Sequence, residues 1–203
     1  VDGAEEVNNQ AVIALSHIPD QPGIAARLFE TLSEAGINVD LIIQATHEGN
    51  SNDITFTVAE TDLESARGVS QCVLDSLGGE LAAEGGLTKL SIGGAGIMGR
   101  PGIAANLFNC LSHQGINLRL IATSEVKVSC VIDSANGAKA LQAVQQAFDL
   151  EDAQISINPS ENGAGEPEVR GVALDRDQGQ LSVRHVRDRP GTAAAWCAAW
   201  AGN

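Results

Sequence analysis

The sequence predicts an α+β fold built from tandem modules, each with the element order βαββαβ and with helices on one face of an antiparallel sheet. Two repeats predict it. Residues 20–41 (DQPGIAARLFETLSEAGINVDL) return without a gap, 79 residues later, as residues 99–120 (GRPGIAANLFNCLSHQGINLRL). Residues 1–26 then align with residues 169–194, also without a gap, at an offset of 168 residues. A fixed internal period indicates modules of about 75–80 residues before any local propensity is considered.

The first module opens with a strand, a turn and a helix. Residues 11–17 (AVIALSH) form a short apolar run that ends in a turn at residues 18–23. Apolar residues then recur at helical spacing through residues 24–35, which gives this helix one apolar face. Pro22 suits the first helical turn, where its missing N–H is not needed. Gly36 suits the position just after the helix end, where a positive φ is tolerated.

Two strands, a helix and a last short strand complete the first module. Residues 37–45 alternate partly and residues 53–59 alternate clearly, which predicts a pair of strands joined by a polar hairpin turn. Residues 61–64 (TDLE) match the capping-box pattern and open a helix that extends to about Leu77. Residues 80–84 supply the last strand.

The second module repeats this order. Its predicted strands are residues 88–92, 116–122, 126–133 and 154–157, and its predicted helices are residues 101–113 and 135–148. The order βαββαβ is the ferredoxin-like motif, in which two helices cover one face of the sheet. The other face is left for a partner module or for solvent, so we expect side-by-side modules or a homodimer.

The repeats also set the expected domain boundaries. The segment NPSENGAGEPE lacks large apolar side chains, which predicts a linker. Only the first strand and part of the first helix of a third module fit before Asn203, so we expect the chain to be a piece of something longer. Such a fragment cannot build a core alone, and we expect it to be disordered or to dock on a neighbour. The expected units are a lead-in strand (1–10), a first module (11–86), a second module (87–157), the linker (158–168) and the start of a third module (169–203).

Composition argues against several classes of partner. The 203 residues include 12 Lys+Arg and carry a formal net charge of -14, so no basic run is present to neutralise the phosphates of a nucleic acid or an anionic membrane. No apolar stretch approaches the roughly 20 residues of a membrane span, and no signal peptide is visible. We therefore expect a soluble cytoplasmic protein. The cysteines, Cys72, Cys110, Cys130 and Cys197, are widely spaced and indicate small buried apolar residues rather than a disulfide or zinc framework.

One pattern favours nucleotide binding, and two observations oppose it. Residues 94–99 match G-x-G-x-x-G between a strand and a helix. The equivalent residues 16–20 of the first module lack these glycines, so the backbone path does not require a phosphate cradle. The following strand carries Asn117 and Arg119, without an acidic residue about 20 positions on to hold a ribose. Neither a metal spacing among the histidines nor a catalytic motif is present, so we expect no cofactor, no metal site and no catalytic residue in this segment.

The repeated turn is the strongest candidate for a binding site. Each repeat begins a helix with N–H groups that have no partner inside the helix, at residues 23–25 and 102–104, and such groups favour a carboxylate. Asp20, beside the first turn, can meet an ammonium or a hydroxyl group. The free N–H groups and Asp20 together suit a free amino acid as the ligand. The alternative is that the repeated turn only connects a strand to a helix and binds nothing. Amide donors and acceptors on the adjacent strands come from Asn38, Gln44 and Asn117.

At these residues the chain resembles the regulatory region of aspartate kinase, which is built from paired ACT domains. The resemblance covers about residues 1–157, and the restart from Val169 resembles the cyanobacterial type, with four ACT domains in two pairs. In this family the lead-in strand, here about residues 1–4, belongs to the sheet of the second module. The matching segments are IPDQPGIAA (18–26), DITFTV (53–58), KLSIGGAGIMGRPG (89–102) and GINLRLIATSEVKVS (115–129).

The resemblance implies that lysine or threonine binds at ACT–ACT interfaces as a feedback inhibitor, that the ACT domains form a homodimer, and that a kinase domain of the full-length protein phosphorylates aspartate. Carried over by position, one effector site comprises Asp20, Gly23, Ala25, Gln44, Asn117 and Leu118. The other comprises Asp40, Gly102, Thr123, Ser124 and Glu125, and Ile24 and Ile103 adjoin the turn glycines.

Two positions depart from the family pattern. His47 stands where several relatives carry serine, and Ala104 stands where a threonine is frequent. The identity of the effector therefore stays open. A free-standing ACT-type module that binds an amino acid or simply dimerises, without a kinase, is the alternative function.

Overall fold

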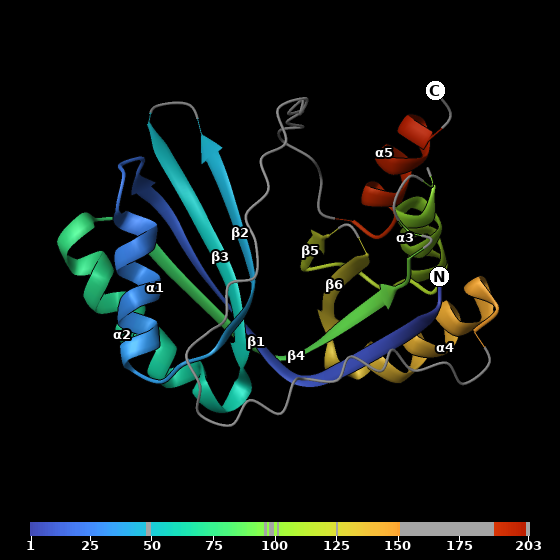
Figure 1. The fold of residues 1–203 in the computed structure, drawn as a ribbon, viewed down its shortest axis with the longest axis horizontal. Coiled ribbons are helices and arrows are strands. Elements are labelled where there is room, and N and C mark those ends of the chain that lie inside the picture. Colours follow the sequence, from blue (N-terminus) through green and yellow to red (C-terminus); the bar gives the residue numbers. More distant parts are fainter. Residues whose placement is uncertain are drawn as a thin grey trace.

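The chain forms one curved antiparallel sheet with helices along its outer face (Figure 1). The structure is a computed structural model, and it describes residues 1–47, 50–95, 97, 100, 102–124, 126–150 and 189–201. Within these residues the sheet has six strands in the order β2-β3-β1-β4-β6-β5.

The elements follow the predicted order. The first module contains β1 (Gly3–Pro19), α1 (Ile24–Glu34), β2 (Val39–His47), β3 (Ser51–Ala59), a 3₁₀ turn (Glu60–Asp62) and α2 (Leu63–Leu77). The second contains β4 (Glu80–Gly93), α3 (Ile103–His113), β5 (Leu120–Thr123), β6 (Lys127–Asp133), a 3₁₀ turn (Ser134–Asn136) and α4 (Gly137–Phe148), and α5 (Thr192–Ala201) follows. The α+β class with tandem modules is confirmed. The predicted strand at 154–157, the linker at 158–168 and the first strand of the third module lie outside the described residues.

Strands β1 and β4 each run through both modules, where the sequence predicted separate strands. The lead-in segment at residues 1–10 continues without a break into the first strand of the first module, and residues 80–84 continue into residues 88–92. The polar and glycine-rich segments at these positions bend the strands instead of ending them. Asn9 takes a φ of 57° and Gly86 a φ of 70°, a backbone region that asparagine and glycine adopt most readily.

The long antiparallel pair of β1 and β4 joins the two modules into one sheet. Gly3 lies opposite Gly93 at one end of the pair, and Ser16 lies opposite Glu80 at the other. The lead-in residues therefore pair inside the second module. Each strand is followed by a repeated turn before the next helix, so the antiparallel arrangement places the first and second turns at opposite ends of the sheet (Figure 1).

Each module has its own apolar core between the sheet and its helices. In the first, Leu28 and Leu32 of α1 are fully buried against Phe56 of β3. In the second, the repeat equivalents Leu107 and Leu111 of α3 are fully buried in the same way. Side chains four residues apart lie on one face of a helix, which is why the apolar period of the sequence predicted these faces correctly.

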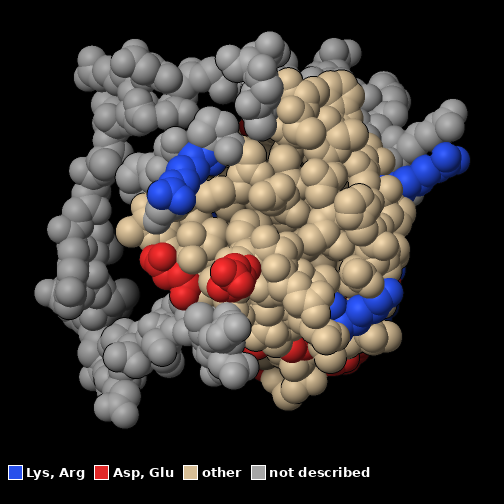
Figure 2. Space-filling view, turned by 90° about the vertical axis from the view of Figure 1, so that its right-hand side faces the viewer, with Lys and Arg blue, Asp and Glu red and all other residues tan. Residues whose placement is uncertain are grey.

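Helix α5 packs on α3 of the second module and extends its core (Figure 1). Ala194 is buried there, and a Cβ built on Gly191 would meet Ser112 Oγ at 2.6 Å, so the two segments approach closely. Neither α3 nor α5 contains a charged Asp, Glu, Lys or Arg residue. Figure 2 accordingly shows few charged side chains among the described residues on this side of the molecule. The third-module fragment was expected either to be disordered or to dock on a neighbour. Its described residues dock on the second module.

Three predicted boundaries are corrected. Helix α1 begins at Ile24 after an N-cap residue, Gly23, with a φ of 93°, so Pro22 precedes the helix instead of standing in its first turn. Strand β5 is shorter than the predicted 116–122, because the chain first passes through an irregular segment. The capping box at 61–64 does not form: a 3₁₀ turn leads into α2, and its N-cap residue makes no side-chain cap hydrogen bond.

The cysteines are free thiols in different environments. Cys130 lies in the core of the second module, and burial raises the pKa of its thiol to about 12. Cys110 and Cys197 are half-buried, and burial raises the pKa of both. Cys72 is exposed, contrary to the expectation of burial, because α2 buries Val73 and not its neighbour.

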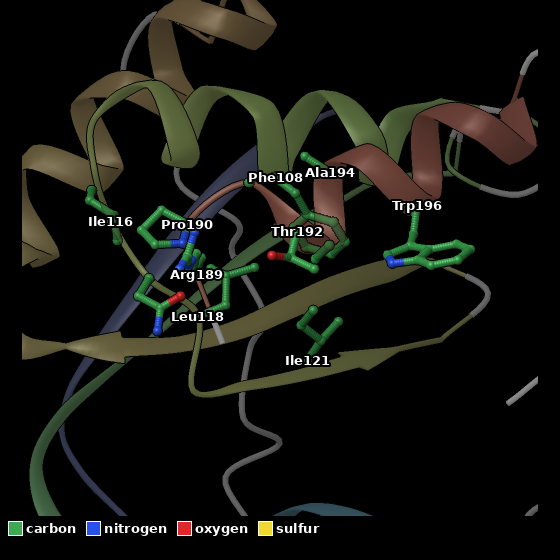
Figure 3. Close-up of a pocket in the computed structure, with 12 residues that line it drawn as sticks. Phe108, Ile116, Leu118, Ile121, Arg189, Pro190, Thr192, Ala194 and Trp196 are labelled. Carbon is green, nitrogen blue, oxygen red and sulfur yellow. The ribbon is translucent and has the colours of Figure 1, made fainter. Parts of the chain in front are cut away.

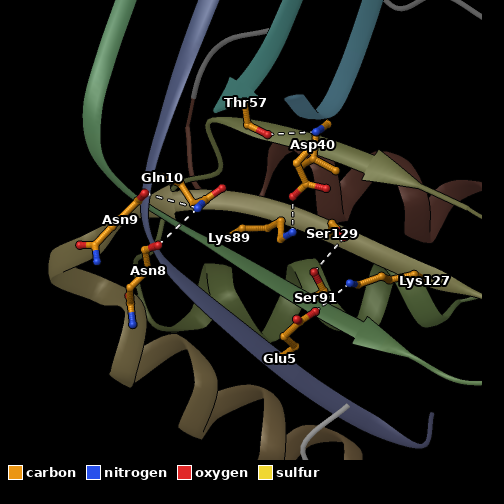
Figure 4. Close-up of polar contacts among 11 residues, drawn as sticks. Glu5, Asn8, Asn9, Gln10, Asp40, Thr57, Lys89, Ser91, Lys127 and Ser129 are labelled. Atoms are coloured by element: carbon orange, nitrogen blue, oxygen red, sulfur yellow. Dashed lines mark hydrogen bonds and ion pairs between the residues drawn. The ribbon is translucent and has the colours of Figure 1, made fainter. Parts of the chain in front are cut away.

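The two modules also contact each other across the sheet face that the helices leave open. Lys89 of β4, in the second module, donates a hydrogen bond to Asp40 of β2, in the first (Figure 4). Within the first module, the backbone N–H of the neighbouring Leu41 donates to Thr57 Oγ1 of β3 at 3.0 Å. The two modules also share an apolar cluster. It contains Val12, Leu41, Ile43, Leu87, Leu120 and Val131, from both modules.

Removing Asp40 and removing Lys89 should lower the free energy of unfolding by different amounts. The Lys89 side chain is 10% exposed, whereas the Asp40 side chain is 42% exposed. We expect Asp40→Ala to lower the free energy of unfolding by about 2–3 kcal/mol, because a buried ammonium loses its partner. Lys89→Met should cost clearly less, since the remaining carboxylate can be hydrated. Urea denaturation measures both.

The exposed pair of Glu64 and Arg67 supplies the control. We expect Glu64→Ala to change the same free energy by less than about 1 kcal/mol. A larger loss in Lys89→Met than in Asp40→Ala would contradict the proposed asymmetry.

Candidate functional site

The repeated turns have one backbone shape but different surroundings. Gly23 and Gly102 each have a φ of 93°, and Gly191, in the third repeat, has a φ of 91°. Such angles favour glycine. A Cβ built on Gly23 meets nothing within 4 Å among the described residues, whereas one on Gly191 runs into Ser112. The first turn is therefore open where the third is closed by packing.

A cavity of about 280 Å³ lies at the first turn. It brings together the predicted residues Asp20, Gly23, Ile24, Ala25 and Gln44. The rest of its lining comes from the end of β1, the turn and strand β3: Ile18, Pro19, Gln21, Pro22, Asn52 and Ile54.

The N-terminus of α1 supplies the positive end of this cavity. The N–H of Arg27 donates to the carbonyl of Gly23 at 2.9 Å, which is the first helical bond. The N–H groups before it have no partner within the helix, and that of Ile24 makes only a long contact of 3.4 Å with the Gln21 carbonyl. The first turn of this fully described helix contains no acidic side chain. An anion is therefore favoured here by both the free donors and the helix dipole.

A carboxylate and a buried amide also line this cavity. Asn52 Nδ2 donates to Asp20 Oδ1 at 2.7 Å, and the backbone N–H of Asp20 donates to the Asn50 carbonyl at 2.9 Å. Asn50 Nδ2 makes a longer contact of 3.4 Å with the Asp20 carbonyl. These bonds fasten the turn to the hairpin of β2 and β3 and fix the position of the carboxylate.

Asn52 is a site residue that the sequence analysis missed. It is only 4% exposed, and its Oδ1 atom has no hydrogen-bond partner among the described residues. A signal was present in the sequence: alternation along β3 places Asn52 on the same face as Ile54 and Phe56, so a polar side chain occupies a position that faces the helices.

A second polar group borders the hairpin. His47 Nε2 lies 2.8 Å from Asp53 Oδ2, and the backbone N–H of His17 donates to Asp53 Oδ1 at 2.9 Å. Burial alone would raise the pKa of the Asp53 carboxyl group. The hydrogen bonds from His17 and His47, with the charge of the histidines, outweigh burial, and this pKa lies below its ordinary value.

The described residues predicted for the other effector site lie on different elements. A cavity of about 340 Å³ at the second turn contains Gly102 and Ile103. Asp40 lies instead in the ion pair with Lys89. Thr123 ends β5, and Glu125 lies outside the described residues. Ser124 follows β5, where its backbone N–H donates to the carbonyl of Lys127 at 2.7 Å.

Asn117 and Leu118 are also separated from the first turn. They line a cavity of about 270 Å³ between α3, β5 and the third turn, where Leu118 lies beneath Arg189 and Pro190 (Figure 3). The remaining lining residues are Phe108, Ile116, Ile121, Gly191, Thr192, Ala193, Ala194 and Trp196.

The start of the glycine-rich segment after β4, at Gly94 and Ala95, contacts a carboxylate of the chain itself. Asp2 Oδ2 accepts a hydrogen bond from the N–H of Ala95 at 3.1 Å, and a Cβ on Gly94 would lie 2.7 Å from the same oxygen. An anionic phosphate would meet this charge, which disfavours nucleotide binding. Among the described residues, no group of His, Cys, Asp or Glu side chains is arranged to hold a metal ion. None of the helices in the described part of the chain combines the length and apolar character that crossing a bilayer requires.

Comparison with known proteins gives consistent matches. Two family models described as ACT domain match residues 12–71 and 90–148. An aspartokinase of Thermus thermophilus is 40% identical over 147 residues, which are 71% of this chain and 36% of that protein. An aspartate kinase of Pseudomonas fluorescens is 32% identical over 152 residues, which are 74% of this chain and 37% of that protein. The chain thus spans just over a third of the length of these relatives.

Solved structures of aspartate kinases are also similar to this chain. The aspartate kinase from Synechocystis covers 100% of this chain with a TM-score of 0.90 and 44% identity, and the match takes up 35% of that protein. The ligand-free regulatory subunit of aspartate kinase from Thermus thermophilus matches with a TM-score of 0.68 and 39% identity, over 73% of this chain and 98% of that one.

The depressed pKa of Asp53 predicts a pH-dependent contribution to stability. A carboxyl group whose folded pKa is lowered contributes fully above its unfolded value, here 3.8, and loses that contribution as the pH falls through the lower folded value. We therefore expect Asp53→Asn to be less stable than the wild type at neutral pH, with a difference that shrinks in acid. Urea denaturation at a series of pH values measures this difference. Asp75→Asn, on the exposed side of α2, is the control, and a difference for Asp53→Asn that is independent of pH would show that the interaction is not electrostatic.

Proposed function

The chain belongs to the aspartate kinase family, as part of its regulatory region of ACT domains, and we propose that it binds a free amino acid, lysine or threonine, as a feedback effector. In this proposal the bound amino acid lowers the activity of the aspartate kinase domain in the full-length protein. Such coupling between sites is typically worth about 1–3 kcal/mol. The site of action would be the cytoplasm, where free amino acids accumulate as products of biosynthesis.

The single observation that carries the proposal is the pair of opposite polarities in the cavity at the first turn. Free N–H groups at the start of α1 face the same cavity as the carboxylate of Asp20. A zwitterionic amino acid carries a carboxylate and an ammonium group a short distance apart. Its carboxylate would accept hydrogen bonds from the N–H groups of residues 23–25, and its ammonium would donate to Asp20.

The side chain of the effector would extend along Gln44 of β2, which lines the cavity and is exposed. An amide can donate and accept, so Gln44 suits either the hydroxyl of threonine or the ammonium of lysine. This feature supports both effectors equally. Titration with each amino acid separately distinguishes the two effectors.

We infer that the first site is completed by a second copy of the chain. Asn117 and Leu118, which the family pattern assigns to this site, lie in a different cavity of the same chain. Because β1 and β4 are antiparallel, the first and second turns face opposite ends of the sheet and cannot share one ligand. A homodimer that places the second module of one copy beside the first turn of the other would assemble the full set.

Isothermal titration calorimetry with lysine, threonine and ATP tests the proposal. We expect the wild type to bind at least one of the amino acids, and Asp20→Ala to weaken that binding more than tenfold, since losing a hydrogen bond to a charged group typically costs about 1.5–3 kcal/mol. Asp75→Ala, which removes an exposed carboxylate on α2, is the matched control and should leave the affinity unchanged. Binding of ATP with no binding of either amino acid would overturn the proposal.

A further inference from the structure

Asn52 carries an unsatisfied acceptor at the cavity of the first turn. Its side chain is more than nine-tenths buried and lines this cavity, yet Oδ1 has no hydrogen-bond partner among the described residues. A buried polar atom without a partner is costly, and such atoms are infrequent in folded proteins. A bound ligand that donates a hydrogen bond would remove this cost.

The orientation of the amide follows from its neighbour. Asp20 Oδ1 lies 2.7 Å from the Asn52 amide, and a carboxylate only accepts hydrogen bonds. The NH₂ group of Asn52 must therefore face Asp20. Turning the amide around would place its oxygen against the carboxylate and lose the bond. The unpaired atom is consequently the acceptor, Oδ1, and it calls for a donor.

The polar groups that line the cavity favour one kind of hydrogen-bond donor on the ligand. Asp20 and Asn52 both line the cavity and carry acceptors, a carboxylate and an unpaired amide oxygen, whereas the start of α1 supplies donors. An ammonium group carries three donors and a positive charge, so it can satisfy both acceptors at once. A hydroxyl group has one donor and could satisfy only one of them.

We infer that Asn52 is a specificity-determining residue that binds the α-ammonium group of the effector. This inference rests on the proposed function and deepens it. Asn52 also orients the Asp20 carboxylate, so the two side chains act as a unit. Together they favour α-amino acids over carboxylic acids of the same side chain that lack the α-amino group.

A purely structural role for Asn52 makes a different prediction. If the residue only fastened the turn to β3, its loss would weaken every ligand of the cavity to a similar degree. If it binds the α-ammonium group, its loss should weaken amino acids and leave the affinity for their deaminated analogues nearly unchanged. The ratio of the two affinities separates the roles.

The experiment compares Asn52→Leu with the wild type by calorimetry. The probes are L-lysine with 6-aminohexanoate, and L-threonine with 3-hydroxybutyrate, where each second compound lacks only the α-amino group. We expect the wild type to prefer the amino acid, and Asn52→Leu to reduce that preference about tenfold or more. Asn52→Thr, whose hydroxyl group can donate to Asp20 and accept from the ligand, should restore part of the preference. Gln71→Leu, an exposed amide on α2, is the matched control and should bind as the wild type does.

The outcomes distinguish the inference from the proposed function. If the wild type binds neither amino acid, both are overturned. If it binds one, and Asn52→Leu keeps the wild-type preference or loses both ligands equally, the inference alone is overturned. Where the analogue binds the wild type too weakly to measure, a fall of about tenfold or more in the amino-acid affinity of Asn52→Leu supports the inference only if the free energy of unfolding matches that of the wild type. An unchanged affinity, or a fall that accompanies a loss of stability, overturns it. If circular dichroism shows that Asn52→Leu does not fold, Asn52→Ala removes the same acceptor and takes its place with the same expectations.

Discussion

The antiparallel pairing of β1 with β4 is the constraint on which the rest of the structure depends. It extends from Gly3 opposite Gly93 to Ser16 opposite Glu80, so one strand pair belongs to both modules. The two apolar cores and the ion pair on the open face follow from it, because it fixes where each helix and each edge strand can lie. It also places the first and second turns at opposite ends of the sheet. The first and second turns of one chain therefore do not line a common site.

Repetition of the sequence reproduces the backbone of the turn but not its chemistry. The turn glycines adopt nearly the same φ in all three repeats. Only at the first turn, among the described residues, does a cavity combine a free helix N-terminus with an aspartate held by a buried asparagine. At the third, Gly191 packs against Ser112. Similar turns thus line an open cavity in one repeat and pack against a helix in another.

Local patterns predicted the elements well and the long-range contacts poorly. The spacing of Leu28 and Leu32 is enough to predict the apolar face of α1, because helical period is a local property. The joining of strands at Gly86 was not predicted, since a glycine pair there is equally compatible with a turn. The assignment of Asp40 to a ligand site by family position stays a prediction. The pairing of Asp40 with Lys89, 49 residues away, was not predicted. Asn52 was missed for the same reason: its partner, Asp20, is distant in sequence, and only the fold shows that one of its atoms is left unpaired.

The central claim is that the carboxylate of a free amino acid binds the start of α1. A crystal structure of the chain grown with lysine or threonine tests it most directly. The account predicts carboxylate oxygens at about 2.7–3.2 Å from backbone N–H groups of residues 23–25, with the α-ammonium group toward Asp20 and Asn52. An amino acid bound elsewhere, with the cavity of the first turn empty, would contradict the account.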